Sequence, residues 1–249
     1  FSSSVSHVVA PLAEEAGIPH IAIASDPALA AGKYTFVHWT PPAAEAALWT
    51  AEAQRRGVHR IAAIILNQQG ATAIFDEVKA RLGNMRLVHE SRFDAGETDF
   101  RTMLLKAKES SPDLYLVGAF SPELEMLAKQ ARELNVTPLS TIESFEFTPQ
   151  PELFEGYWYV NAADPTDEFR ERYESRFGAA PTPGAANAYD AARLLALSTG
   201  SIDELHAIRD FPGALGNLTI DAEGIVWSKP VVRQIVNGKP VTMNPYQSG

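Results

Sequence analysis

Short segments that are wholly apolar alternate with amphipathic segments of about 10 to 15 residues along most of this chain. Residues 61–65 are apolar at every position, and residues 114–117 repeat the pattern. A strand without a polar side is typical of a parallel sheet that is covered on both faces. Parallel strands are joined by right-handed crossovers, usually through a helix. The sequence therefore predicts an α/β fold with a parallel sheet.

Other segments fit the same alternation of strands and helices. Strands are predicted at residues 20–24, 86–89, 139–142, 157–160, 218–220 and 231–236, the last one entering an Asn237-Gly238 turn. Helices are predicted at about residues 42–56, 72–82, 122–134, 167–177, 185–197 and 202–209.

Two more helices are predicted from the spacing of apolar residues. The first carries Val5, Val8, Val9 and Leu12 and ends at Gly17. The second carries Phe100, Met103, Leu104 and Ala107 on one face, and Thr98 is its predicted N-cap.

Composition excludes several classes of protein. The 249 residues are 45% hydrophobic and 21% charged, which argues against a disordered chain. No apolar run approaches the roughly 20 residues that a membrane span needs. A net charge of -10 argues against nucleic acid as the main partner. The absence of cysteine excludes disulfides, zinc–thiolate sites and cysteine nucleophiles.

The sequence lacks the motifs that mark common catalytic and cofactor sites. It contains no G-x-G-x-x-G, no G-x-x-x-x-G-K-[ST], no H-E-x-x-H and no G-x-S-x-G. Its six histidines are scattered, and none lies four residues from another. We therefore expect no catalysis, no cofactor and no metal.

Polar residues do follow the predicted strands, where ligands of open parallel sheets bind. They are Ser25 and Asp26, residues 67–70 (including Gln69), Ser121 with the aromatic Phe120 before it, and Glu143 with Ser144. Residues 1–4, Phe-Ser-Ser-Ser, precede a helix directly, so their hydroxyls and backbone N–H groups suit a carboxylate.

Each of these residues also has a structural interpretation. Serines before a helix are often N-caps, and Ser25-Asp26 before Pro27 is typical of a turn. Phe120 would equally close a core, and Glu143 would equally be a solvated loop acid. The residues alone therefore predict a small-molecule pocket and no specific ligand.

Residues 8–29 resemble the periplasmic leucine/isoleucine/valine-binding protein family, the type I substrate-binding proteins of ABC importers. Shorter segments extend the resemblance, in order, across the chain: residues 60–64, 99–100, 112–113, 119–123, 130–132, 155–156, 189–191 and 220–224.

The resemblance implies two Rossmann-like lobes joined by three chain crossings, with the ligand captured between them. Lobe one would hold residues 1–39 and 161–223, and lobe two residues 40–160 and 224–249. The family's chain ordinarily has a further βαβα stretch before the position of Phe1. The resemblance therefore implies that lobe one is incomplete in this sequence.

The resemblance also assigns roles in ligand binding. Ser3 corresponds to the serine that receives the ligand carboxylate, with Phe1 and Ser2 beside it. Residues Ile23, Ala24 and Ser25 correspond to the segment that offers backbone groups and a hydroxyl to the head of an amino acid.

The second lobe matches the family less closely. Phe120 falls where the branched-chain binder has a tyrosine. Glu143 lies within one residue of the acid that pairs with the ammonium, so Ser144 is a rival. The aromatic residue expected near Gln69 is absent, which leaves amino acids and aromatic or aliphatic carboxylates open as ligands. Trp39 is either an aromatic wall of the site or a packed hinge residue.

The resemblance thus implies a periplasmic or other extracytoplasmic protein that delivers a small amino acid or related carboxylate to the membrane permease of an ABC importer. We expect it to be a monomer that does not bind nucleic acid. The alternative is a ligand-sensing regulatory domain of the same fold, similar to the amide sensors related to the family.

Overall fold

The computed structural model describes residues 2–243, which form two compact units. Unit 1 comprises the chain up to Pro42 together with Ala162–Pro230, and unit 2 comprises Ala43–Asn161 and the chain from Val231 onward. The chain therefore passes from one unit to the other three times. Residues 224–230, which we had assigned to lobe two, belong to unit 1 because they carry a strand that pairs there.

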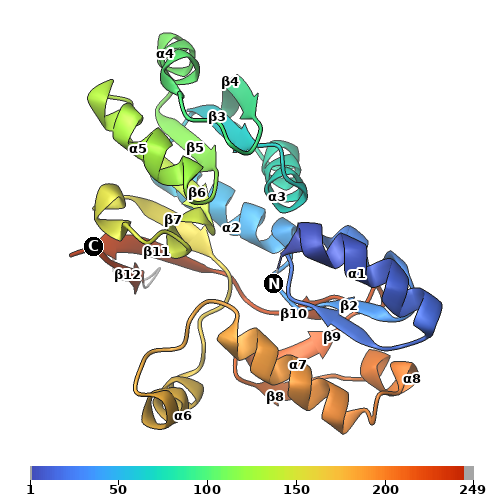
Figure 1. The fold of residues 1–249 in the computed structure, drawn as a ribbon. Helices are drawn as coiled ribbons and strands as arrows, with labels where there is room; N and C mark the ends of the chain where they lie inside the picture. The colour runs from blue at the N-terminus through green and yellow to red at the C-terminus, as the bar shows by residue number, and fades with distance from the viewer. Residues whose placement is uncertain (1, 244–249) are drawn as a thin grey trace. The chain divides into compact units, whose positions relative to one another are not determined.

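Unit 2 is built on a seven-stranded sheet with the order β12-β11-β7-β6-β5-β3-β4 (Figure 1). Strands β3 to β7 are parallel to one another, whereas β11 is antiparallel to both of its neighbours, β7 and β12. The predicted α/β fold with a parallel sheet is confirmed. The strands are β3 (Arg60–Leu66), β4 (Arg86–Phe93), β5 (Leu114–Gly118), β6 (Leu139–Ile142), β7 (Trp158–Asn161), β11 (Val231–Val236) and β12 (Lys239–Thr242).

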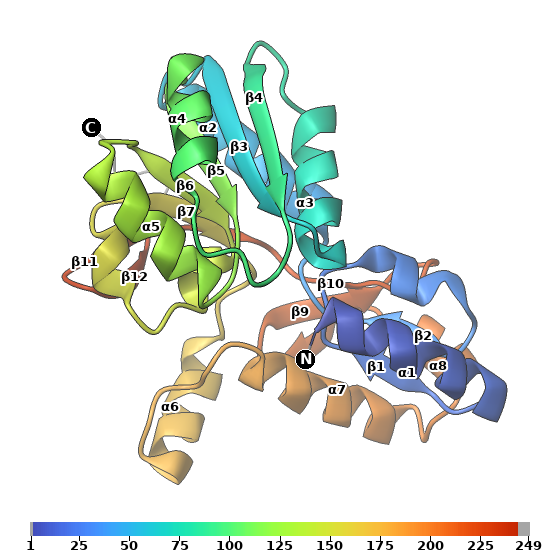
Figure 2. The same cartoon turned by 45° about the horizontal axis from the view of Figure 1, so that its top comes forward.

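Helices cover both faces of this sheet (Figure 2). One face packs against α4 (Arg101–Glu109) and α5 (Glu123–Glu133), and the other against α2 (Pro42–Arg55) and α3 (Gln69–Ala80). Alternate residues of β3 enter the two cores: Ile64 lies in the first and Ile65 in the second. Because both faces are covered, every position of this strand after Arg60 is apolar.

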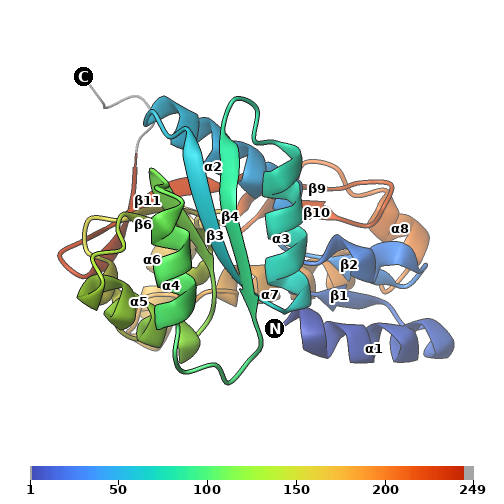
Figure 3. The same ribbon diagram turned by 90° about the horizontal axis from the view of Figure 1, so that it is seen from above.

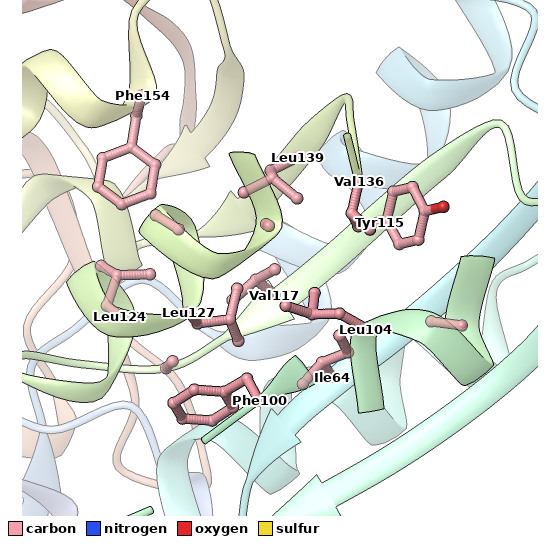
Figure 4. Close-up of a cluster of buried hydrophobic side chains, with 14 of the residues drawn as sticks. Ile64, Phe100, Leu104, Tyr115, Val117, Leu124, Leu127, Val136, Leu139 and Phe154 are labelled. Carbon is pink, nitrogen blue, oxygen red and sulfur yellow. The ribbon is translucent and has the colours of Figure 1, made fainter. Parts of the chain in front are cut away.

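The core on the side of α4 and α5 explains the predicted helix around Leu104. Phe100, Leu104 and Leu127 converge on Ile64 and Val117 of the sheet (Figure 4), and all five side chains are buried. The apolar face of this helix was therefore predicted correctly.

The start of this helix was predicted wrongly. Helix α4 begins at Arg101 with Phe100, not Thr98, at the N-cap position. The side chain of Gln130 explains the difference. Its Oε1 accepts a hydrogen bond from the Phe100 N–H (2.7 Å), and its Nε2 donates to the Thr98 carbonyl (2.8 Å). A side chain of the neighbouring helix α5 thus caps the start of α4, whereas the sequence predicts a cap from Thr98 itself.

The opposite core contains a polar link between two tryptophans. Trp49 is fully buried, and its Nε1 donates to the Ser140 hydroxyl at 3.0 Å. That hydroxyl donates in turn to the Trp158 carbonyl at 2.9 Å, and the two indoles stack at 5.7 Å. Ser140 therefore satisfies polar groups of both neighbours within an apolar core.

Unit 1 has smaller sheets. Strands β1 (His20–Ala22) and β2 (Thr35–Val37) are parallel, and β2 is extended by a bridge from Val37 to Ile225. The antiparallel strands are β8 (Phe211–Gly213), β9 (Gly216–Ile220) and β10 (Val226–Trp227). The helices are α1 (Ser3–Ala16), α6 (Asp167–Phe177), α7 (Ala185–Leu197) and α8 (Ile202–His206).

Helix α1 lies beside β1 and β2 (Figure 3) and ends, as predicted, at Gly17, whose φ of 65° is left-handed. Its buried side is made of small residues, including Ala10 and Ala13. The apolar spacing that predicted the helix lies on its outer side, where Val8 is 69% and Leu12 60% exposed. Small side chains are buried because they let the helix approach the short strands closely.

A buried histidine and a buried aspartate meet in unit 1. Asp190 of α7 accepts hydrogen bonds from the N–H groups of Ala214 (2.7 Å) and Leu215 (3.2 Å), which fix the β8–β9 turn. The Nε2 atom of His38 lies 4.0 Å from the Oδ2 atom of Asp190. Neither ring nitrogen of His38 has a hydrogen-bond partner in residues 2–243. Burial lowers the pKa of His38 to about 4, so the imidazole is neutral at neutral pH.

We predict that Ser140→Ala lowers the free energy of unfolding by about 1–3 kcal/mol, because the Trp49 N–H loses its acceptor in a dry core. Chemical denaturation measures the change. The matched control is Ser175→Ala on the exposed side of α6, which should stay within about 0.5 kcal/mol. Equal stability of the two variants would contradict the role given to Ser140.

We predict that His38 makes the protein sensitive to acid. The pKa of His38 in the folded protein lies below the ordinary 6.5. Between these two values the imidazole is protonated in the unfolded chain and neutral in the folded protein. Stability should therefore fall as the pH drops from 6.5 through about 4, by about 3 kcal/mol from this group. In His38→Gln that part of the fall should vanish. Denaturation curves at several pH values test this, and parallel profiles would refute it.

Candidate ligand-binding site

In unit 1, the predicted ligand residues lie where β1 ends and α1 begins. Ile23, Ala24 and Ser25 directly follow β1, with Ala24 buried and the other two half-buried. Ser2 occupies the N-cap position of α1 without capping it through its side chain, and Ser3 is the first, buried residue of the helix. Phe1 lies outside the described residues.

One hydrogen bond ties these two segments together. His7, one helical turn beyond Ser3, lies with its Nε2 2.7 Å from Oδ2 of Asp26, the residue after Ser25. The other carboxylate oxygen of Asp26 accepts from the Ala28 N–H at 3.0 Å and caps the short 3₁₀ helix at Pro27–Ala31. Asp26 therefore has a structural role. Through its hydrogen bond with His7 it holds the segment that contains Ser25 near the first turns of α1.

In unit 2, two further candidates line one hollow at the carboxyl ends of the parallel strands. Phe120 and Ser144 line it together with apolar residues at the ends of β3, β5 and β6, such as Ile65 and Ile142. Its volume of about 20 Å³ accommodates roughly one water molecule and no amino acid. This hollow thus supplies one apolar wall and does not enclose a ligand.

The remaining candidates of unit 2 differ in exposure. Glu143 and Ser144 are both buried and directly follow β6, and Glu143 adopts a left-handed φ of 66°. Gln69 is the first residue of α3 and is exposed, and it does not line the hollow. Phe120 is half-buried and makes an edge contact with Phe147 at 6.1 Å.

Sequence reasoning missed two buried polar residues near Glu143. Asn161 ends β7, beside Val160, whose carbonyl accepts the Glu143 N–H at 2.8 Å. The Oδ1 atom of Asn161 has no hydrogen-bond partner in the described part of the chain. The rule that selected the other candidates would have found it, because it directly follows the predicted strand at 157–160.

Glu45 is the second residue that was missed. It lies in the first turn of α2 and is completely buried, and no described donor reaches either carboxyl oxygen. Burial raises the pKa of Glu45 well above its ordinary value, and the charge of Glu143 and a hydrogen bond with it raise it further. An acid in the first turn of a helix is so common that the sequence gives no sign of this burial.

A larger hollow of about 770 Å³ lies in unit 1 along α6 and α7. Aromatic rings and arginines line it, with Arg172 over Tyr189 and Arg176 over Phe177. It contains none of the predicted ligand residues, and its polar side chains include no buried, unpartnered atom. We therefore place the candidate site at the strand ends.

Within residues 2–243, no three His, Asp or Glu side chains are grouped so that they could hold a metal ion. The helices in this range are all too short or too polar to cross a membrane.

Solved structures of similar fold are solute-binding proteins. A leucine-binding protein of Thermotoga maritima superposes with a TM-score of 0.86 at 22% identity, covering 97% of this chain and 77% of its own. The branched-chain amino acid transporter substrate-binding protein of Streptococcus pneumoniae, in complex with isoleucine, gives 0.82 at 21% identity, with 97% and 78% covered.

A third similar structure binds another class of ligand. It is a solute-binding protein of an ABC transporter from Rhodopseudomonas palustris in complex with 3,4-dihydroxybenzoic acid, with a TM-score of 0.79 at 19% identity. It covers 97% of this chain and 76% of its own. At these identities the likeness establishes the fold.

Sequence comparison establishes the family. No curated protein sequence matches this chain. A family model described as "Periplasmic binding protein", however, matches residues 1–201. That match covers most of the chain, and the fold agrees with it, so this chain belongs to the periplasmic binding protein family.

Proposed function

We propose that this protein is an extracytoplasmic solute-binding protein that delivers a small amino acid or related carboxylate to the membrane permease of an ABC importer. The observation that carries the proposal is the presence of polar groups at strand ends, where the buried Glu143 follows β6 and the half-buried Ser25 follows β1. It is supported by membership of a family of binding proteins. We propose no catalytic step.

In this proposal unit 1 binds the carboxylate of the ligand. The first N–H groups of α1 have no side-chain cap from Ser2, and Ser3 stands at the first position of the helix. Uncapped N–H groups at a helix start suit an anion. The Ser25 hydroxyl and the backbone of Ala24 then hold the remaining polar atoms of the head group.

Unit 2 also offers groups that suit such a ligand. Glu143 is a buried carboxylate, so an ammonium group would be a suitable partner for it. The hollow lined by Phe120, Ile65 and Ile142 offers an apolar wall, which favours a ligand with an apolar side chain. A ligand that carries both charges needs a hydrogen-bonded partner for each of them.

The first prediction from this function concerns the class of ligand. We expect one chemical class in a panel of amino acids and aromatic acids to raise the melting temperature of protein freed from co-purified ligand. At about 100 times its Kd a ligand adds about 2.7 kcal/mol of stability. Apolar amino acids should give the largest shift. A flat response across the panel from folded protein would argue against the proposal.

The second prediction concerns the residues. We expect Ser25→Ala to weaken amino-acid binding about tenfold, and Glu143→Ala to weaken it at least about thirtyfold, because the ammonium loses its buried partner. Calorimetric titration measures both. The matched controls are Ser175→Ala and Glu152→Ala, which alter exposed residues. Unchanged affinity in both site variants would refute the assignment of the site.

A further inference from the structure

Two phenylalanine rings meet at the carboxyl ends of the parallel strands of unit 2. Phe120 comes shortly after β5, and Phe147 directly follows the short 3₁₀ helix at Ser144–Glu146. The ring centroids lie 6.1 Å apart in an edge contact, and both side chains are half-buried. Phe120 also lines the small hollow there with Ile65 and Ile142. These two rings, the Phe120–Phe147 pair, are therefore part of the apolar wall and remain partly exposed.

A single carboxylate ties together the two segments that carry these rings. Neither ring belongs to a helix or a strand, so hydrogen bonds of regular secondary structure do not fix them. The Oε1 atom of Glu125 in α5 accepts a hydrogen bond from the Ser121 hydroxyl at 2.6 Å and from the Thr148 hydroxyl at 2.5 Å. Ser121 is the residue after Phe120, and Thr148 is the residue after Phe147. One oxygen atom thus anchors the neighbours of both rings.

Glu125 is held firmly enough to act as this anchor. Its helix packs on the sheet through the fully buried Leu127 and the nearly buried Leu124. Glu125 itself is 4% exposed, so water has little access to compete for its hydrogen bonds. Hydrogen bonds from hydroxyl groups to a carboxylate are stronger than those between neutral groups. The position of the two segments therefore depends on a rigid and buried acceptor.

The segment around Phe147 is anchored on its other side as well. Glu146, the residue before Phe147, accepts hydrogen bonds from Arg233 at 2.6 Å and from the Tyr159 hydroxyl at 2.7 Å. With Thr148 bonded to Glu125, both sequence neighbours of Phe147 are fixed by side chains from other elements. This ring is consequently held from two directions while part of its surface stays exposed.

We propose that Glu125 is a positioning residue that holds the Phe120–Phe147 pair as a preformed wall for a large apolar side chain of the ligand. The role in binding rests on the proposed function, whereas the fixed position of the rings does not. Rings that are in place before the ligand arrives cost less entropy to order on binding. The anchor therefore favours ligands whose apolar part is long enough to reach the pair over ligands that carry the same head group alone.

The experiment compares Glu125→Ala, which removes the acceptor, with Glu125→Gln, whose amide oxygen can still accept both hydroxyl groups. The matched control is Glu123→Ala. Glu123 is a buried acid of the same helix, but its Oε1 accepts from the Gly96 N–H at 2.7 Å, in the loop after β4. Loss of Glu123 therefore removes a buried hydrogen bond of α5 and leaves both anchors of the rings intact.

The position of Phe120 is measured first, in ligand-free protein. The methyl groups of Ile65 and Ile142 line the hollow beside its ring, so their NMR resonances report ring-current changes when the ring moves. We expect Glu125→Ala to shift these resonances, and Glu125→Gln and Glu123→Ala to leave them close to those of the wild type. Unchanged resonances in Glu125→Ala would overturn the positioning role.

Two further variants test whether the anchor is shared. Ser121→Ala and Thr148→Val each remove one hydroxyl donor, and Ser121 is exposed, so its substitution is compatible with folding. Each should shift the methyl resonances in the wild-type background and have almost no further effect in Glu125→Ala. Equal effects in the two backgrounds would contradict a common acceptor.

Ligand binding is the second readout, with leucine and phenylalanine as long apolar probes and alanine as a probe with the same head group. For whichever long probe binds the wild type, Glu125→Ala should weaken binding about tenfold, and Glu125→Gln should recover most of that loss. Binding of alanine should weaken by no more than about twofold. An equal loss for alanine and the long probes would refute selection by the wall, since a general disturbance of the fold weakens all probes alike.

The two proposals fail in distinguishable ways. If the methyl resonances do not respond to Glu125→Ala, the anchor is refuted whatever the protein binds. If they respond as expected but no member of the ligand panel binds to the wild type, the anchor is supported and the proposed function fails.

Discussion

The double-sided burial of strand β3 is the constraint on which the rest of unit 2 depends. Ile64 points into the core with α4 and α5, and Ile65 into the core with α2 and α3, so helices must cover both faces. A chain that places helices on both faces of a sheet must return to the same end after each strand. The neighbouring strands are therefore parallel, and their carboxyl ends share one edge.

That edge is where the polar groups of the unit collect. At the end of each strand the chain leaves the hydrogen-bonded ladder, so backbone groups and side chains there are free to face a ligand. Ser144 and Phe120 follow adjacent strands and line one hollow, although 24 positions separate them in the sequence. The parallel sheet, and no local motif, brings them together.

The same edge holds groups that are costly for the fold. Glu45 and Glu143 are buried side by side, and the Oδ1 atom of Asn161 lacks a partner in residues 2–243. The core elsewhere in unit 2 avoids such costs: Ser140 satisfies Trp49 and Trp158 at the same time. Within unit 2, the described buried side-chain atoms without a partner belong to Glu45 and Asn161, and such costs are typical of functional sites, in keeping with the ligand site proposed there.

The sequence by itself determined the fold class and most of the elements, because apolar periodicity reports burial directly. Helix α6 and strands β6 and β11 have the bounds that it predicts, and strand ends identified Ser25 and Glu143 as candidates. Tertiary structure decided what depends on partners distant in the chain. Gln130 moved the start of α4 past Thr98, and close packing turned Val8 of α1 outward. It also placed Glu45 against Glu143 from 98 positions away, a contact that no local pattern records, since burial and charge are set by the assembled fold.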